Sequence, residues 1–335
     1  MRAAVFEGNG VLKVQDVPDP IISTPDEVIL KVAANGVCGT DVHALDVPPK
    51  VAFFPGVVIG HEFSGTVIEA GKESGAKVGD RVGVLPQIPC YQCSRCRDGK
   101  INLCLYMSVY GAYERNGGAA EYVTVKREVI HPLDDRLSVE LAALAEPLSV
   151  TLSASTRIHW HPGRSALIFG AGPIGLLFLL YAKSSGASPI FVVEPTPGRR
   201  QLASEFGADR VIDPSNEDIN EVVRELSFDG ADIVIDSVGT LLNEAISVAA
   251  TGAQVVVFGI NETATVSVPP YQILRKELVI MGTFLAKNTF PLALKLLAEN
   301  RQGFDRLVTR FPLEHATDAV SKLRAGTAVK ALLVP

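Results

Sequence analysis

The sequence is poor in cysteine and has no long uninterrupted apolar run. Five of its 335 residues are cysteine, a small odd number that argues against a disulfide framework. The most apolar stretch, residues 166–182, contains three glycines and one proline, and it is shorter than the roughly 20 residues that cross a bilayer. The first residues show no apolar signal segment. We therefore expect a cytoplasmic protein without a membrane anchor.

Positive charge is not in excess either. The chain has 31 lysines and arginines against 37 aspartates and glutamates, a net charge of −6. A chain of this sign is a poor partner for nucleic acid or anionic lipid. Hydrophobic residues at 47% and charged residues at 20% are typical of a globular protein, and the length suggests two domains. We therefore expect a small-molecule partner, and neither nucleic acid nor a membrane.

Four of the five cysteines lie within fifteen residues, in the pattern C-x2-C-x2-C-x7-C. They are Cys90, Cys93, Cys96 and Cys104. The short gaps allow the sulfurs to surround one point, which predicts a structural Zn²⁺ with four thiolates and no open position. An iron–sulfur cluster also takes four thiolates, but its two common ferredoxin spacings differ from this one. Because the segment is also basic, a zinc lobe that binds nucleic acid is an alternative from another functional class.

A second set of metal-ligand types is spread along the chain. It consists of Cys38, His61 and Glu62, with Glu146 as a further candidate. A mixed sulfur, nitrogen and oxygen site with fewer than four protein ligands leaves a position for water or substrate, as catalytic metal centres do. Taken alone, each residue has an ordinary structural explanation. The interpretation of this set as a catalytic metal site is supported only if the chain also has a nucleotide-binding motif.

That motif is Gly170-x-Gly172-x-x-Gly175, between an apolar strand and a helical run. Its glycines permit a tight turn, close approach of a pyrophosphate and packing of helix on strand. Glu194 ends the next apolar strand, where a carboxylate accepts both ribose hydroxyls and repels a 2′-phosphate. This favours NAD over NADP, although Arg199 close behind is of a type that accommodates a 2′-phosphate.

The alternation of strands and helices predicts an α/β fold. About six continuous apolar strands lie within residues 148–284, as in a doubly wound parallel sheet covered by helices on both faces. The first 145 residues instead contain short β-branched runs between glycine, proline and aspartate turns, which indicates a β-rich domain. The last fifty residues predict helix, strand, helix and strand.

These motifs, taken in order, resemble a known family, the zinc-dependent medium-chain dehydrogenase/reductases (alcohol dehydrogenases), and most closely its polyol and threonine dehydrogenase branch. The motifs that carry the resemblance are GVCGTDVH at 36–43, GHEFSG at 60–65, the four-cysteine segment, AEPLSV at 145–150 and GAGPIG at 170–175. The resemblance implies a GroES-like β-barrel catalytic domain over 1–147, with a structural zinc lobe at about 88–106. It also implies a Rossmann NAD-binding domain over 148–285 and a C-terminal segment, 286–335, that completes the barrel.

The resemblance also implies roles for single residues. Cys38 and His61 match catalytic zinc ligands, and Glu62 and Glu146 match two glutamates that bind the metal directly or through its water, with the choice open. Thr40 matches the hydroxyl that takes the proton of the substrate alcohol and passes it through the cofactor ribose to His43, the outer member of a proton relay. The candidate cofactor-binding residues are Gly170, Gly172, Pro173, Ile174, Gly175, Glu194, Arg199, Phe258, Gly259, Ile260, Gly282 and Thr283.

From this resemblance we expect an NAD-dependent zinc oxidoreductase with two Zn²⁺ per chain. It would transfer a hydride between NAD and a secondary alcohol, which is a polyol, cyclitol, sugar phosphate or amino alcohol. Bacterial members of the branch imply a homo-oligomer, a tetramer or a dimer. A zinc-free NAD(P)H reductase of the same fold is the alternative within the family.

The sequence departs from sorbitol dehydrogenases at two places. Ala44 stands where they usually have an aromatic residue after the relay histidine, and residues 284–286 read Phe-Leu-Ala where they usually have an arginine. Both residue types help to hold a polyhydroxylated substrate in those enzymes. Two explanations of Phe53 and Phe54 stay open: they form a smaller, more apolar pocket, or they belong to the barrel core.

Overall fold

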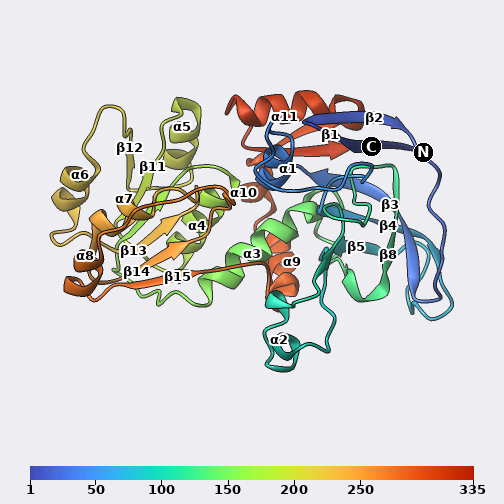
Figure 1. Ribbon diagram of the computed structural model, residues 1–335, viewed down its shortest axis with the longest axis horizontal. Helices are drawn as coiled ribbons and strands as arrows, with labels where there is room; N and C mark the ends of the chain where they lie inside the picture. Colours follow the sequence, from blue (N-terminus) through green and yellow to red (C-terminus); the bar gives the residue numbers. More distant parts are fainter. The chain divides into compact units, whose positions relative to one another are not determined.

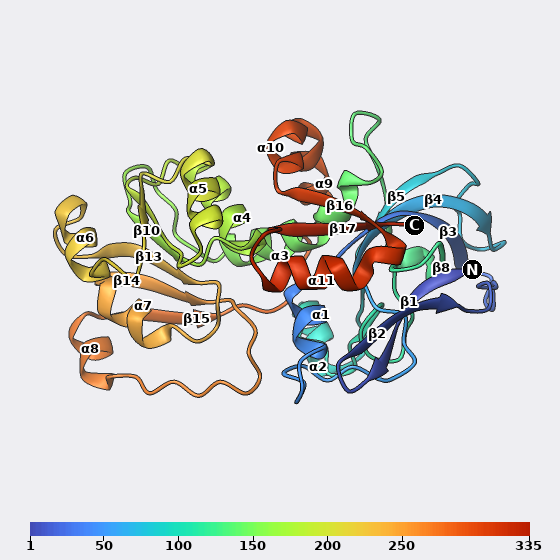
Figure 2. The ribbon, with the colours of Figure 1, turned by 90° about the horizontal axis from the view of Figure 1, so that it is seen from above.

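The computed structural model describes residues 1–335 and separates them into two compact units. Unit 1 comprises residues 1–150 and 285–335, and unit 2 comprises residues 151–284. Figures 1 and 2 show both units as ribbons. None of the helices has the length and apolar character of a membrane span.

Unit 2 is built on a six-stranded parallel sheet with the order β12-β11-β10-β13-β14-β15. The strands are β10 (Ala166–Phe169), β11 (Ile190–Val193), β12 (Arg210–Ile212), β13 (Ala231–Asp236), β14 (Ala249–Val257) and β15 (Val279–Gly282). All residues of β10 and β11 are buried, because helices cover both faces of the sheet. The strand order reverses between β10 and β13, which is the point where doubly wound sheets bind ligands. The predicted fold class is confirmed.

Helices connect these strands and cover the sheet. They are α4 (Pro173–Ser184), α5 (Pro197–Glu205), α6 (Ile219–Leu226), α7 (Leu242–Val248) and α8 (Pro270–Arg275), while α3 (Ala145–Ser155) spans the division between the units. Figure 2 shows α4 and α5 on one face of the sheet and α7 on the other. Local chemistry sets their starts: Pro173 opens α4, where a missing N–H costs nothing, and the Asp218 side chain caps α6.

Unit 1 is built on a curved seven-stranded sheet and two small two-stranded sheets. The sheet runs β16-β17-β3-β4-β5-β9, and β8 also pairs with β3. Its strands are β3 (Glu27–Gly36), β4 (Glu62–Ala70), β5 (Arg81–Val84), β8 (Tyr122–Lys126), β9 (Ile130–Pro132), β16 (Val308–Pro312) and β17 (Lys330–Val334). One small sheet is the hairpin of β1 (Arg2–Gly8) and β2 (Val11–Asp16), and the other pairs β6 (Gln87–Ile88) with β7 (Ser108–Val109) across the cysteine segment. The last strand, β17, lies between β16 and β3, so the end of the chain is a central part of the sheet.

The helices of unit 1 are short. They are α1 (Gly39–Ala44), α2 (Ser94–Arg97), α9 (Phe290–Glu299), α10 (Arg301–Asp305) and α11 (Ala316–Arg324), with single 3₁₀ turns η1 (Ile101–Leu103), η2 (Arg127–Val129), η3 (Leu141–Leu144) and η4 (Leu313–His315). Ala44 and Phe53 are buried in the core beneath α11, where the Phe53 ring meets Phe6 edge-on at 6.1 Å. Phe54 is 59% exposed. Of the two explanations for this pair, core membership holds for Phe53.

Candidate active site and metal centres

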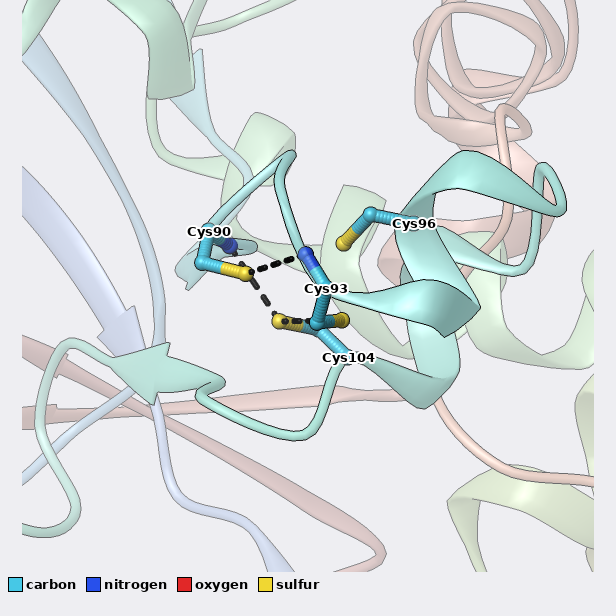
Figure 3. Close-up of side chains that lie close together, drawn as sticks. All are labelled: Cys90, Cys93, Cys96 and Cys104. Carbon is cyan, nitrogen blue, oxygen red and sulfur yellow. Dashed lines mark hydrogen bonds between the residues drawn. The ribbon is translucent and has the colours of Figure 1, made fainter.

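The four cysteines of the segment 90–104 come together as predicted from their spacing. Their sulfurs lie within 4.8 Å of one another, and Figure 3 shows them pointing toward a common centre. The Cys93 and Cys104 sulfurs are 3.9 Å apart. A tetrahedron with Zn–S bonds of about 2.3 Å has sulfur–sulfur edges of about 3.8 Å. The cluster therefore has the size of a closed zinc shell.

Backbone N–H groups donate hydrogen bonds to the sulfurs of this cluster and stabilise their thiolate forms. The Cys90 N–H donates to the Cys104 sulfur at 3.2 Å, and the Cys93 N–H donates to the Cys90 sulfur at 3.3 Å. Amides of Leu105 and Cys96 lower the pKa of Cys93 to about 6, whereas burial raises the pKa of Cys96 to about 12. Four sulfurs this close cannot all be thiolates without a cation among them. The cysteines form no disulfide, so the donor set fits a structural Zn²⁺.

The second cluster consists of Cys38, His61 and Glu62, whose ligand atoms also lie within 4.8 Å of one another. Antiparallel pairing of β3 with β4 brings these residues together, because Gly36 at the end of β3 faces Glu62 at the start of β4. Gly36 is required here, since a Cβ at this position would collide with the Glu62 carboxylate. Cys38 follows two residues later as the N-cap of α1. One sulfur, one nitrogen and one oxygen ligand fit an open, catalytic zinc site.

Asp41, to which the sequence assigned no role, connects two of these ligands. Its Oδ2 accepts a hydrogen bond from the Cys38 N–H at 2.8 Å, and its Oδ1 lies 3.6 Å from His61 Nδ1. A carboxylate on the second ring nitrogen is the usual way of orienting a metal-ligating histidine. Burial raises the pKa of Asp41. Burial alone would lower the pKa of His61, but the charges of Asp41 and Cys38 outweigh it and raise that pKa well above its usual value.

Lys330 is the second residue that the sequence did not reveal. Its side chain is 2% exposed and donates to the Glu62 carboxylate and to the Val37 carbonyl, the latter at 3.1 Å. The pairing of β17 with β3 delivers it to this place. Burial would lower the pKa of Lys330, but the charges of Glu62 and Cys38 raise it. The ligand cluster of Cys38, His61 and Glu62 therefore has a buried cation, Lys330, paired with its Glu62 carboxylate.

Glu146 lies outside the three-ligand cluster. It belongs to the first turn of α3 and is 7% exposed. Burial raises its pKa to about 7; the His61 charge opposes this rise and the Glu62 charge adds to it. Glu62, and not Glu146, is thus grouped with Cys38 and His61 in this structure.

The two relay candidates belong to α1. Thr40 Oγ1 lies 3.6 Å from the Cys38 sulfur, next to the cluster. His43 lies one turn later, and its Nδ1 faces the Asp46 carboxylate at 3.5 Å.

In unit 2, the glycine motif forms the turn from β10 to α4. Gly170 has a φ of +93°, and a Cβ on Gly175 would collide with the Gly170 carbonyl oxygen. Space around Gly172, by contrast, is open. Glu194 is 3% exposed and accepts backbone hydrogen bonds from Ala171 and Thr196, each at 2.8 Å. Each carboxylate oxygen retains a second acceptor position for a ribose hydroxyl.

The other cofactor candidates lie at the same edge of the sheet. Phe258, Gly259 and Ile260 follow β14, Gly282 and Thr283 end or follow β15, and Pro173 and Ile174 open α4. The carboxyl ends of parallel strands are where such sheets bind dinucleotides. Arg199 lies in the first turn of α5, and its neighbour Arg200 pairs with Asp213 at 2.9 Å. The residues present therefore fit a dinucleotide.

Two family models match the chain. The alcohol dehydrogenase GroES-like domain matches residues 24–135, and the zinc-binding dehydrogenase domain matches residues 173–299. The chain is 35% identical to a sorbitol dehydrogenase of Bombyx mori, over 99% of this chain and 97% of that one. An alcohol dehydrogenase from Thermus sp. ATN1 shares its fold with a TM-score of 0.92 and 31% identity, over 100% of both chains. The structure of a zinc-binding dehydrogenase of Sinorhizobium meliloti 1021 bound to NADP matches with a TM-score of 0.89 and 32% identity. The match covers 100% of this chain and 99% of that one.

Proposed function

Since the chain belongs to the zinc-dependent medium-chain dehydrogenases, in their polyol dehydrogenase branch, we propose that it oxidises a secondary alcohol of the polyol or sugar-alcohol class with NAD. The observation that carries the proposal is the cluster of Cys38, His61 and Glu62, which offers a metal three different ligands and leaves further positions open. The zinc-free reductase lacks support, because the chain has both ligand sets. The family models and relatives named above are dehydrogenases, and they favour the oxidoreductase over the nucleic-acid-binding alternative.

The two units take separate parts in this proposal. Unit 1 would hold the substrate and both zinc ions, and unit 2 would bind the cofactor. Zn²⁺ supplies Lewis acidity to an alcohol oxygen, and NAD⁺ is the acceptor of a hydride. The bound alcohol loses one hydride and one proton and becomes a ketone.

The chain's own residues hold the metal and move the proton. Cys38, His61 and Glu62 are the proposed direct ligands, and Asp41 and Lys330 keep His61 and Glu62 in place. Glu146 would act from outside the shell, through water. Thr40 would take the substrate proton, and His43 would release a proton to water as the outer member of a relay whose middle member is the cofactor ribose.

The cofactor preference follows from Glu194. Its carboxylate accepts hydrogen bonds from two backbone amides, which hold a negative charge at the place where a 2′-phosphate would lie. Arg200 is engaged by Asp213 and by two backbone carbonyls, which leaves it poorly placed to bind that phosphate. We therefore propose a preference for NAD over NADP.

A screen of secondary alcohols tests the proposal. Polyols, cyclitols, sugar-alcohol phosphates and amino alcohols are each offered with NAD and with NADP, and the absorbance of the reduced nicotinamide is followed. Metal analysis of the same preparation should give about two zinc per chain. Reduction of neither cofactor by any alcohol, in a protein that carries both ions, would refute the function.

We also propose a homo-oligomer in a reducing compartment such as the cytoplasm. The edge strand β15 has a free side, and Val279, Tyr271, Leu274 and Phe284 are exposed on the same unit. An exposed apolar edge is a liability unless another chain covers it. Light scattering on the zinc-loaded protein measures the oligomeric state, and a monomer at all concentrations would contradict this part.

A further inference from the structure

The relay histidine sits in a cluster of charged side chains that the proposed chemistry leaves unexplained. His43 Nδ1 is buried, makes no hydrogen bond, and lies 3.5 Å from Asp46 Oδ2. The side chain as a whole is 34% exposed, so the ring has one buried nitrogen and an accessible remainder. The charged group that pairs with the buried nitrogen is therefore a carboxylate.

Asp46 is itself held from two sides. Lys50 Nζ lies 2.9 Å from its Oδ2, and Arg324 Nη2 lies 3.0 Å from its Oδ1. The same Arg324 nitrogen donates to the Val42 carbonyl at 3.2 Å, which ties α11 to α1. The lysine's contact, with smaller contributions from His43 and Arg324, holds the pKa of Asp46 below its usual value. The carboxylate is therefore charged, and two cations hold it beside the imidazole.

Backbone hydrogen bonds also hold the segment 43–50 in place. The amides of Asp46 and Lys50 both donate to the His43 carbonyl, at 3.3 and 3.0 Å. Residues 43–50 thus fold back on the histidine, and the acceptor in front of Nδ1 is fixed by main-chain and side-chain contacts together.

We propose that Asp46 is the positioning residue of the relay: it keeps His43 in the tautomer with the proton on Nδ1, so that Nε2 is free to accept the relayed proton. This inference rests on the proposed function of His43. During turnover Nε2 takes one proton while Nδ1 keeps its own, and the imidazolium faces the Asp46 carboxylate. Nε2 then gives that proton to water, and the ring returns to its starting tautomer. A carboxylate that fixes the tautomer of a catalytic imidazole is a general device.

The two cations give this arrangement a second property. Asp46, Lys50 and Arg324 together carry a charge of about +1 at neutral pH. Asp46 is therefore an ion-paired carboxylate, and its place in front of the imidazole is set by contacts other than the one with His43. Asp46→Asn removes the acceptor, leaves two cations uncompensated, and offers an amide N–H that favours the other tautomer.

The tautomer of His43 tests the inference without reference to activity. The full-length, zinc-loaded protein is labelled with ¹⁵N-histidine, and the His43 signals are identified among the six histidines by their loss in His43→Gln. We expect the Nδ1–H tautomer in the unaltered chain and in Lys50→Gln, and the Nε2–H tautomer in Asp46→Asn. An Nε2–H tautomer in the unaltered chain would overturn the inference, and so would an unchanged tautomer in Asp46→Asn.

Kinetics supply the second measurement. With the alcohol identified by the screen, kcat should fall about 10²–10⁴-fold in Asp46→Asn, as expected for loss of general acid–base catalysis, while KM changes little. The double variant with His43→Gln should be no slower than His43→Gln alone, because the two residues act as a unit. Asp134→Asn, which removes a surface ion pair with Arg136, is the matched control and should match the unaltered chain.

The failures can be told apart. If no alcohol is oxidised, the proposed function is wrong, and the tautomer still decides whether Asp46 positions His43. If the enzyme oxidises an alcohol and His43→Gln retains full kcat, the dehydrogenase function stands and the relay inference is overturned. Should Asp46→Asn fail to fold, Arg324→Gln loosens the same carboxylate, and a partial shift of tautomer populations is then the required result.

Discussion

Replacement of Lys330 by methionine should destabilise unit 1 strongly, and more so without zinc. Lys330 is 2% exposed and its partner Glu62 is 1% exposed. Methionine preserves most of the side chain's length but leaves a buried carboxylate without its cation and the Val37 carbonyl without its donor. Removal of one partner of a buried ion pair costs about 3–5 kcal/mol.

This cost can be converted into a melting temperature. In domains of 150–250 residues, 1 kcal/mol shifts Tm by about 2–4 °C, so Lys330→Met should lower the Tm of the unit by about 6–20 °C. A bound Zn²⁺ supplies positive charge beside Glu62. The drop should therefore be smaller in the zinc-loaded protein than in the zinc-stripped one, and zinc should also bind more weakly, since Glu62 loses its fixed position.

Calorimetry of both forms, with metal analysis after dialysis, measures these effects. Lys295→Met is the control, because its exposed pair with Glu299 at 3.9 Å is of a kind worth about 0–1 kcal/mol. The double variant Lys330→Met with Glu62→Gln should recover part of the lost stability in the zinc-stripped form, since no charge is then left buried alone. A Tm within 2 °C, roughly 1 kcal/mol, of the unaltered chain in both forms would refute the reasoning.

Three further outcomes follow from the two zinc sites and the nucleotide turn. Cys38→Ser should lower the zinc content from about two to about one per chain and abolish alcohol oxidation, because a hydroxyl is a poor substitute for a soft thiolate. An unchanged circular dichroism spectrum would show that the fold persists. Glu194→Ala should reduce the ratio of kcat/KM for NAD over NADP by about tenfold, or about 1.4 kcal/mol, and an unchanged ratio would count against its ribose role. After zinc removal at pH 7, iodoacetamide should modify Cys93 first and Cys96 last, following their pKa values of about 6 and about 12. Peptide mapping by mass spectrometry gives that order, and equal rates would contradict it.

The sequence predicted the fold through signals that are local. Continuous apolar strands, the glycine turn and the four closely spaced cysteines each depend on neighbours in the chain, and the sheet of unit 2 and the sulfur cluster follow from them. The family resemblance supplied the rest of the architecture, including the return of the chain's end to unit 1. The assignment of single site residues to roles stays a prediction until the variants above are measured.

What the sequence did not reveal depends on distant contacts. Asp41 was visible in principle, because an acidic residue three positions after an N-cap is the capping-box pattern, yet its second contact with His61 arises only from the pairing of β3 with β4. Lys330 gave no signal at all. A single lysine before an apolar run is typical of a strand end at the surface, and only the central position of β17 makes it buried. The carboxylate of Asp46 is likewise held by a distant residue, Arg324, which is 278 positions away in the chain.

These distant contacts have a common physical cause. A catalytic zinc site must gather negative ligands in a buried place, and their mutual repulsion has to be balanced whether or not the ion is bound. Here the balancing cation, Lys330, lies on the last strand of the chain, and Arg324 on the last helix pairs with the Asp46 carboxylate beside His43, the proposed relay histidine. The C-terminal segment therefore does more than close a sheet, because it carries the positive charges that hold two carboxylates of the N-terminal segment in their working positions. The ligand cluster of unit 1 and the residues that support it thus come from both ends of the chain, whereas unit 2 has a sheet and a core of its own.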